Sequence, residues 1–171
     1  MNHWKSSRRG LLARGALLSA AALSLVGARP AHAKGETPST LKVGQTSKNA
    51  AIVLAFCKAG EDRQVEKQMS FIAEDSTYRN MPDEPMFVGA AKIRALLTSY
   101  IDSSEKTEIN VLRIAEAGDG VVLTERVDRF LTKGKWIDCP VMGAAVVKNG
   151  KIMEWRDYYD NLRIAAQMKG V

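Results

Sequence analysis

Hydrophobic and polar positions follow two different periods along the chain, and the period changes near residue 103. Before that point, apolar residues recur at helical spacing in three segments. Ser47 and Asp62 precede the first two stripes and belong to the residue types that cap helices. The third stripe is the most regular, with Ile93, Leu96, Leu97, Tyr100 and Ile101 on one face. The pattern predicts three helices, with residues 76–81 as a short strand before the third.

After residue 103 the alternation has the period of two that is typical of β-strands. Pro140 inside the third strand predicts a bulge or an unpaired edge, and Asn149-Gly150 is the clearest of the hairpin turns. The expected strands are 106–116, 121–131, 136–147 and 152–159, followed by a short helix over 161–167. Helices followed by a strand meander indicate an α+β fold. We expect a strongly curved, mixed and mostly antiparallel sheet that forms a cone, with the N-terminal helices packed over it and an internal pocket.

Residues 1–33 have the pattern of a cleaved export signal. Lys5, Arg8 and Arg9 precede an apolar run of small residues over 11–26, which is short and weakly hydrophobic for a membrane anchor. Ala31-His32-Ala33 then matches a small-x-small cleavage site. The segment from Ser7 to Leu12 resembles a twin-arginine signal. We therefore expect an exported, periplasmic protein with no stable membrane insertion once the signal is cleaved.

The rest of the chain divides into a leader and one domain. Residues 34–46 are polar and rich in Gly, Pro, Ser and Thr, as in a flexible leader. Residues 47–171 are enough for a single cone-fold domain with its own core.

Removing the signal changes the charge and the available chemistry. Five of the 25 Lys and Arg residues and none of the 19 Asp and Glu residues lie in it, which leaves 20 against 19 and a net charge of +1. That balance gives no indication of a nucleic-acid partner. Both histidines, His3 and His32, also lie in the signal, so the mature chain has no Ser–His or Cys–His machinery and no His-ligated metal site. Cys57 and Cys139 are too few for a zinc site, and whether they form a disulfide stays open.

Polar residues spaced for one strand face occur on three of the predicted strands. Arg126 and Asp128 share a face, as do Tyr78 and Asn80, and Asp157 lies on the last strand. If these faces point inward, one pocket holds two carboxylates, a guanidinium, a phenol and an amide. This pattern alone supports two interpretations equally well. The residues could form a buried ion-pair network that only stabilises the sheet, or they could form an active site.

Three motifs carry a resemblance to limonene-1,2-epoxide hydrolases. They are Tyr78-x-Asn80-Met81-Pro82, Glu125-Arg126-Val127-Asp128 and Trp155-Arg156-Asp157-Tyr158-Tyr159-Asp160, in the same order and with similar spacing. That family has the cone-shaped fold shared with nuclear transport factors, polyketide cyclases and ketosteroid isomerases. The resemblance covers residues 47–160.

The resemblance implies a role for each matched residue. Asp157 would be the general base, Asp128 the general acid and Arg126 the bridge between them, while Tyr78 and Asn80 would help to hold a water. It implies one-step hydrolysis of a hydrophobic epoxide to a vicinal diol, with water as co-substrate, no covalent intermediate and no metal or organic cofactor. It also implies a homodimer formed through the outer face of the sheet.

Two other functions stay open at this stage. One is a cone-fold isomerase or cyclase, which would not need an arginine between two aspartates. The other is a non-catalytic periplasmic protein that binds a small molecule. The sequence identifies neither the epoxide nor the regiochemistry and stereochemistry of its opening, and an export signal is unexpected in the best-known members of the family.

Strand alternation also predicts where the other candidate side chains point. It directs four of them outward, away from the pocket: Glu125, Arg129, Arg156 and Tyr158. We expect Trp136 and Met142 in the core or at the pocket rim.

Overall fold

The computed structural model describes residues 47–82, 84–117 and 120–169. The predicted export signal and leader, residues 1–46, lie outside the described residues. No helix in the described part of the chain is long and apolar enough to cross a membrane.

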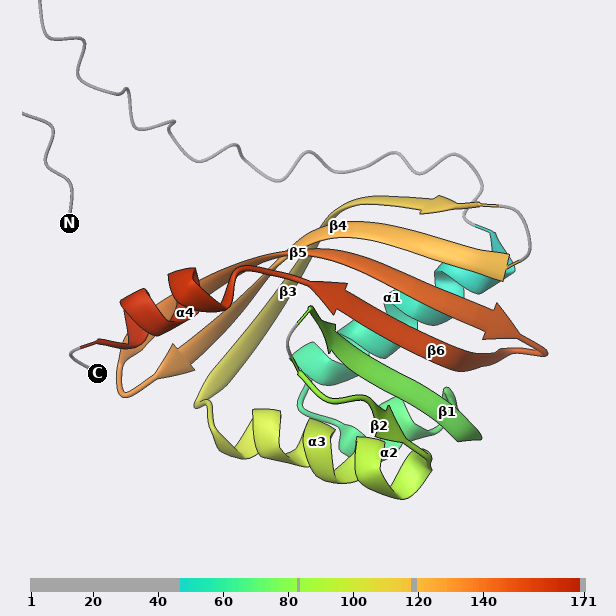
Figure 1. The fold of residues 1–171 in the computed structure, drawn as a ribbon, viewed down its shortest axis with the longest axis horizontal. Coiled ribbons are helices and arrows are strands. Elements are labelled where there is room, and N and C mark those ends of the chain that lie inside the picture. Colours follow the sequence, from blue (N-terminus) through green and yellow to red (C-terminus); the bar gives the residue numbers. More distant parts are fainter. Residues whose placement is uncertain (1–46, 83, 118–119, 170–171) are drawn as a thin grey trace, which may run out of the picture. The chain divides into compact units, whose positions relative to one another are not determined.

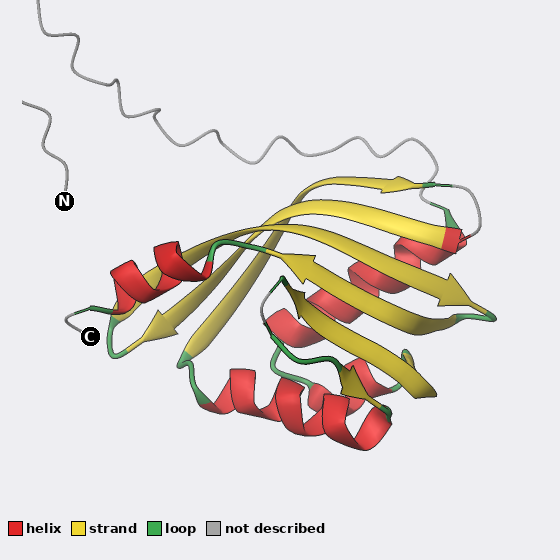
Figure 2. Cartoon of the chain, in the orientation of Figure 1, coloured by secondary structure: helices red, strands yellow, loops and turns green. Residues whose placement is uncertain are grey.

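Six strands form one curved sheet, in the order β2-β1-β6-β5-β4-β3 (Figures 1 and 2). Strands β1 and β6 are parallel, and every other neighbouring pair is antiparallel. This is the mixed, mostly antiparallel sheet of an α+β fold, as the sequence pattern predicted. The strand bounds are β1 Ile72–Met81, β2 Phe87–Val88, β3 Lys106–Glu116, β4 Val121–Thr132, β5 Lys135–Lys148 and β6 Lys151–Tyr158.

Three helices lie on the concave side of the sheet, and a fourth follows β6 (Figure 1). Their bounds are α1 Lys48–Glu61, α2 Val65–Met69, α3 Ala90–Asp102 and α4 Asn161–Met168. Helix α1 begins as predicted, because the Ser47 hydroxyl accepts a hydrogen bond from the Ala50 amide at 3.0 Å. The stripes of α1 and α3 are buried against the sheet, with Val53, Phe56, Ile93 and Leu97 in the core.

Two local predictions were wrong. Asp62 does not cap the second helix; it follows the last turn of α1, and Gln64 precedes the short α2 without a side-chain cap. Strand β1 begins at Ile72 rather than at Ser76. The polar residues Glu74 and Asp75 hid its first half, because there the register with β6 shifts and the alternation is interrupted.

Pro140 lies at a locally unpaired edge, which is one of the two positions the sequence predicted. Strand β6 pairs with β5 only from Met142 onward, so the first half of β5 has β4 as its single neighbour. Helix α4 covers part of this edge through Gln167. Its side-chain amide accepts from the Asp138 amide and donates to the Asp138 carbonyl, both at 2.9 Å. These two hydrogen bonds hold the C-terminal helix against an edge of β5 that would otherwise be exposed.

Candidate active site

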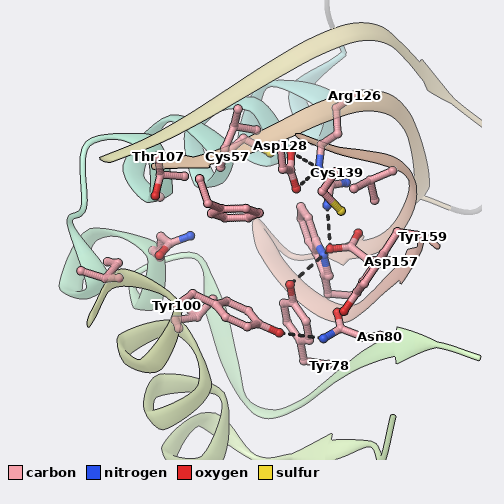
Figure 3. A pocket seen from close by; sticks show the side chains of 18 of the residues that line it. Cys57, Tyr78, Asn80, Tyr100, Thr107, Arg126, Asp128, Cys139, Asp157 and Tyr159 are labelled. Carbon is pink, nitrogen blue, oxygen red and sulfur yellow. Dashed lines mark hydrogen bonds and ion pairs between the residues drawn. The ribbon is translucent and has the colours of Figure 1, made fainter. Parts of the chain in front are cut away.

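A cavity of about 340 Å³ lies between the concave face of the sheet and the helices. Its size is typical of a small-molecule site. Most of the polar side chains gather at one part of its wall, where Figure 3 shows them converging from β1, β4, β6 and α3, while Thr107 lies apart from them. The remaining wall is largely apolar and includes Phe56, Leu97, Ile101, Ile109, Phe130, Val141, Trp155 and Ile164.

Arg126 is the centre of the polar cluster. Its guanidinium is 3 % exposed and is shared between two carboxylates (Figure 3). Nε donates to Asp128 at 3.0 and 3.1 Å, and Nη2 lies 2.6 Å from Asp157 Oδ2. Nη1 donates to the Thr124 hydroxyl at 3.1 Å. Burial lowers the pKa of Arg126, but the charges of Asp157 and Asp128 outweigh it and the net pKa is raised well above its usual value.

Asp128 holds its proton more tightly than an ordinary aspartate. Burial raises the pKa of its carboxyl group to about 6; Arg126 opposes this shift and the negative charge of Asp157 adds to it. Among the described residues, Arg126 alone donates hydrogen bonds to it. Asp128 is therefore a carboxyl group that can exist in its protonated form close to neutral pH.

The two oxygens of Asp157 have different surroundings. Oδ2 accepts from the Tyr78 hydroxyl at 3.2 Å and faces Arg126. Oδ1 is buried and accepts no hydrogen bond from the described residues. A buried carboxylate oxygen without a donor is costly, and a bound water or ligand is the usual remedy.

Asn80 stands beside Asp157, because the two residues are register partners in the parallel pair β1–β6. Its side-chain nitrogen uses both hydrogens, donating to Glu84 Oε2 at 2.7 Å and to the Tyr100 hydroxyl at 2.6 Å. This arrangement fixes which way the amide faces. The Asn80 oxygen accepts no hydrogen bond from the described side chains, so it is free to accept one from a water or ligand.

The structure thus brings together all five residues singled out from the sequence: Arg126 directly contacts Asp128 and Asp157, Tyr78 contacts Asp157, and Asn80 lies next to Asp157. Two further polar neighbours, Glu84 and Tyr100, were missed. Tyr100 was assigned to the apolar stripe of a helix, and Glu84 lies in a loop without periodicity. Thr124 was also missed, although it stands two residues before Arg126 on the same strand face, and that spacing could have revealed it.

The outer face of the sheet holds two residues that were expected inside. Met142 is 54 % exposed, and Trp136 packs against the cations of Lys106 and Arg129, with Lys106 Nζ 5.5 Å and Arg129 Cζ 4.6 Å from the ring centre. The prediction for both was wrong, because even-numbered residues of β5 face outward while Cys139, Val141 and Gly143 face inward. Phe130 and Trp155 line the cavity, whereas Val122 is fully buried in the core.

Cys57 and Cys139 are both buried, free thiols in the cavity wall. Burial raises the pKa of each to about 12, so neither carries a thiolate near neutral pH. Among residues 47–82, 84–117 and 120–169, no three Cys, Asp or Glu side chains are grouped as metal ligands.

Comparison with known proteins places these observations in a family. The model of the limonene-1,2-epoxide hydrolase catalytic domain matches residues 47–169. An LEH-like epoxide hydrolase from M. tuberculosis is similar in structure, with 25 % identity and a TM-score of 0.64 over 74 % of this chain and 92 % of that chain.

Two other solved structures share the fold at lower identity. A putative SnoaL-like polyketide cyclase from Shewanella putrefaciens has 16 % identity and a TM-score of 0.65 over 75 % of this chain and 90 % of that one. A hypothetical protein with a ketosteroid isomerase-like fold from Catenulispora acidiphila has 22 % identity and a TM-score of 0.63, with 69 % and 92 % covered. These likenesses concern the fold and not the reaction.

Proposed function

The chain belongs to the limonene-1,2-epoxide hydrolase catalytic-domain family, and from that membership we propose that it is an epoxide hydrolase. It adds water to a hydrophobic epoxide and gives a vicinal diol in one step. The observation that carries the proposal is the bridge of Arg126 between Asp128 and Asp157, next to a buried Asp157 oxygen that no described residue contacts as a donor.

We place the nucleophilic water between two acceptors, of which the buried Asp157 Oδ1 must turn toward the cavity to receive it. Neither Asp157 Oδ1 nor the Asn80 side-chain oxygen has a donor among the described residues, and the two residues are neighbours across β1 and β6. A water has two hydrogens and can donate one to each. Tyr78 donates to the other oxygen of Asp157, so it positions the base rather than the water in this arrangement. The water oxygen then keeps a lone pair for attack.

The reaction needs a proton to leave the water and another to reach the epoxide oxygen. As the water oxygen bonds to an epoxide carbon, its proton passes to Asp157. The bond between that carbon and the epoxide oxygen breaks, and Asp128 supplies the proton for the departing oxygen. The diol contains all the atoms of water and epoxide, and the two aspartates have exchanged protonation states. Each such proton transfer contributes about 10²–10⁴-fold to the rate.

The electrostatics support this division of roles. An acid must hold its proton until the ring opens, and the raised pKa of Asp128 provides that property. Asp157 has the unpaired oxygen that a base requires. Arg126 stabilises the one negative charge that the two carboxyl groups share before and after the transfer.

Oxygen labelling in a single turnover tests the proposal. With enzyme in excess over a small hydrophobic epoxide in H₂¹⁸O, we expect a diol that carries the label after one turnover. Label in an aspartate instead would indicate a covalent ester and contradict the one-step mechanism. An isomerised or cyclised product would favour a cone-fold isomerase or cyclase, and binding of epoxides without any product would favour a binding protein.

We also propose that the protein is exported through its twin-arginine-like N-terminus, an inference that rests on the sequence alone. Expression of the full chain in a bacterium with the twin-arginine system should give a periplasmic product that begins near Lys34. Replacing Arg8 and Arg9 with lysine should retain the protein in the cytoplasm. Two results would contradict the proposal: periplasmic protein that still begins at Met1, or export that is unaffected by the replacement of Arg8 and Arg9.

A homodimer through the outer face of the sheet is a further part of the proposal. Met142 and Tyr158 are register partners on β5 and β6 and are 54 % and 45 % exposed, and Leu123 on β4 is 42 % exposed. Large apolar side chains gathered on one sheet face favour association. Light scattering should give the mass of two chains, and Met142→Glu should give the mass of one. A monomeric wild-type protein would contradict the dimer.

A further inference from the structure

Glu84 is a carboxylate in the cavity wall that the hydrolytic step does not use. Its Oε2 accepts from the Asn80 amide at 2.7 Å and its Oε1 from the Tyr159 hydroxyl at 3.4 Å. Both donors are neutral. In the described part of the chain no lysine or arginine lies within ion-pair distance of this carboxylate. Glu84 therefore keeps capacity to accept a strong hydrogen bond from a ligand.

Tyr100 stands on the other side of the same amide. Its oxygen accepts from Asn80 at 2.6 Å, so its own hydrogen points elsewhere, and no described residue accepts it. Burial raises the pKa of Tyr100 to about 12, which keeps the phenol a donor at any ordinary pH. The cavity thus offers a free acceptor and a free donor that flank one amide nitrogen.

A hydroxyl group is the ligand that satisfies both. It donates to Glu84 and accepts from Tyr100, whereas an ammonium group has no lone pair for Tyr100 and an unsubstituted hydrocarbon leaves both groups unpaired. A carboxylate is disfavoured by charge. Among the described residues that line the cavity, Arg126 is the single cation, and it is already shared by Asp128 and Asp157.

We propose that the substrate is an epoxy alcohol, whose hydroxyl lies close to the epoxide and binds between Glu84 and Tyr100. This inference rests on the proposed function and names its substrate class. The distance from the reacting water is short, because Asn80 presents its oxygen to the water and its nitrogen to Glu84 and Tyr100. The hydroxyl therefore lies within a few bonds of the attacked carbon and orients the ring as well as selecting the substrate.

The test compares four epoxides that share one carbon skeleton and carry a hydroxyl, a hydrogen, an amine or a carboxylate at the same position. We expect kcat/KM to be highest for the hydroxyl compound, by about tenfold or more over the hydrogen compound, since a hydrogen bond to a charged group is at stake. The carboxylate compound should be the poorest. Equal kcat/KM for the hydroxyl and hydrogen compounds, or a preference for the amine, would overturn the proposal.

Two variants test whether the preference for the hydroxyl compound arises from Glu84 and Tyr100. Tyr100→Phe and Glu84→Gln should each reduce the hydroxyl-to-hydrogen ratio by about tenfold, and Glu84→Gln should also improve the carboxylate compound relative to the others. The readout is the hydroxyl-to-hydrogen ratio of kcat/KM within one variant, because a purely structural defect lowers kcat/KM for both substrates together. Glu154→Gln is the matched control, as this side chain lies on the outer face and is 47 % exposed. A ratio that stays at the wild-type value in both variants contradicts the proposal.

Binding separates this inference from the proposed reaction. Cyclopropane isosteres of the hydroxyl and hydrogen compounds have no ring oxygen to open, and calorimetry measures their affinity directly. Tighter binding of the hydroxyl isostere, lost in Tyr100→Phe, supports the hydroxyl subsite even if no epoxide is hydrolysed. Efficient hydrolysis of all four epoxides with equal affinity for both isosteres would support the hydrolase and overturn the subsite.

Discussion

Gly143 on β5 lies directly against the guanidinium of Arg126 on β4. A Cβ at residue 143 would overlap Nη1 of Arg126, and it would also crowd the Thr124 hydroxyl and approach Asp157 Oδ1 to 3.1 Å. The backbone of Gly143 does not have a positive φ. Residue 143 must therefore be glycine because there is no space for a side chain, and not because its backbone conformation requires glycine.

Gly143→Ala should therefore displace Arg126 and uncouple the two aspartates. We expect a loss of about 10²-fold in kcat/KM, because small misplacements of reacting groups have effects of that size. Overpacking should also cost about 1–3 kcal/mol of unfolding free energy. Urea unfolding and steady-state kinetics measure both. Gly134→Ala is the control, since its Cβ meets nothing within 4 Å but its φ of +73° is unfavourable for alanine. It should lose stability and retain activity.

Arg126→Gln should nearly abolish turnover and destabilise the fold. The change leaves Asp128 and Asp157 buried beside each other without their cation, and breaking a buried pair in this way costs about 3–5 kcal/mol. We expect the destabilisation to shrink at low pH, where the Asp128 carboxyl group becomes neutral. Urea unfolding at pH 5 and pH 8 measures the difference. Equal losses of free energy at the two pH values would show that Arg126 does not compensate these charges.

Asp128 should make activity and stability fall as the pH rises. A general acid works only while protonated, so kcat/KM should decrease above about pH 6, the pKa of Asp128. The folded pKa is above the ordinary 3.8, so the folded state binds this proton more tightly than the unfolded state. The resulting contribution to stability is complete below about pH 4 and disappears as the pH passes about 6, amounting to roughly 3 kcal/mol.

Asp128→Asn isolates that contribution. The variant should be nearly inactive, and the difference in unfolding free energy between variant and wild type should change across pH 4–7 by the amount that Asp128 contributes. Asp157→Asn should also be nearly inactive because the base is lost. A variant at residue 128 with wild-type activity above pH 7 would exclude Asp128 as the acid.

The thiols of Cys57 and Cys139 should be inert in the folded protein. With pKa values of about 12, about one thiol in 10⁴ is ionised at pH 8, and both are buried. We expect negligible alkylation by iodoacetamide in buffer and two alkylated thiols in guanidinium chloride, with or without prior reduction. Mass spectrometry counts the labels. A requirement for reduction before the thiols react would reveal a disulfide instead.

Gln167→Ala should loosen the C-terminal helix. The variant loses the two hydrogen bonds to the Asp138 backbone and leaves that strand edge unpaired, at a cost of about 1–3 kcal/mol. Because Asn161 and Ile164 of α4 line the cavity, KM should rise more than kcat falls. Hydrogen exchange at Asp138 and steady-state kinetics provide the measurements. Leu162→Ala removes an 82 % exposed side chain from the same helix and should change neither.

Features that depend on local periodicity could be predicted from the sequence. The period of two places Arg126 and Asp128 on one face of β4, and the helical stripes place Phe56 and Leu97 against the sheet, because side-chain direction follows from backbone geometry alone. Asn149-Gly150 forms the turn between β5 and β6 as its composition predicted, with Gly150 at a positive φ. The absence of histidine from the chain after residue 33 excludes most competing chemistries whatever the fold.

The meeting of these residues in one site depends on tertiary structure. Asn80 is beside Asp157 because β1 and β6 pair in parallel, although 77 positions separate them in the chain. Glu84 and Tyr100 join the site through Asn80, and Gly143 leaves room for Arg126 across two strands. Such contacts depend on strand register and helix placement, which no short stretch of sequence encodes. The arginine and aspartate of β4 form half of the candidate site, and the fold supplies the other half.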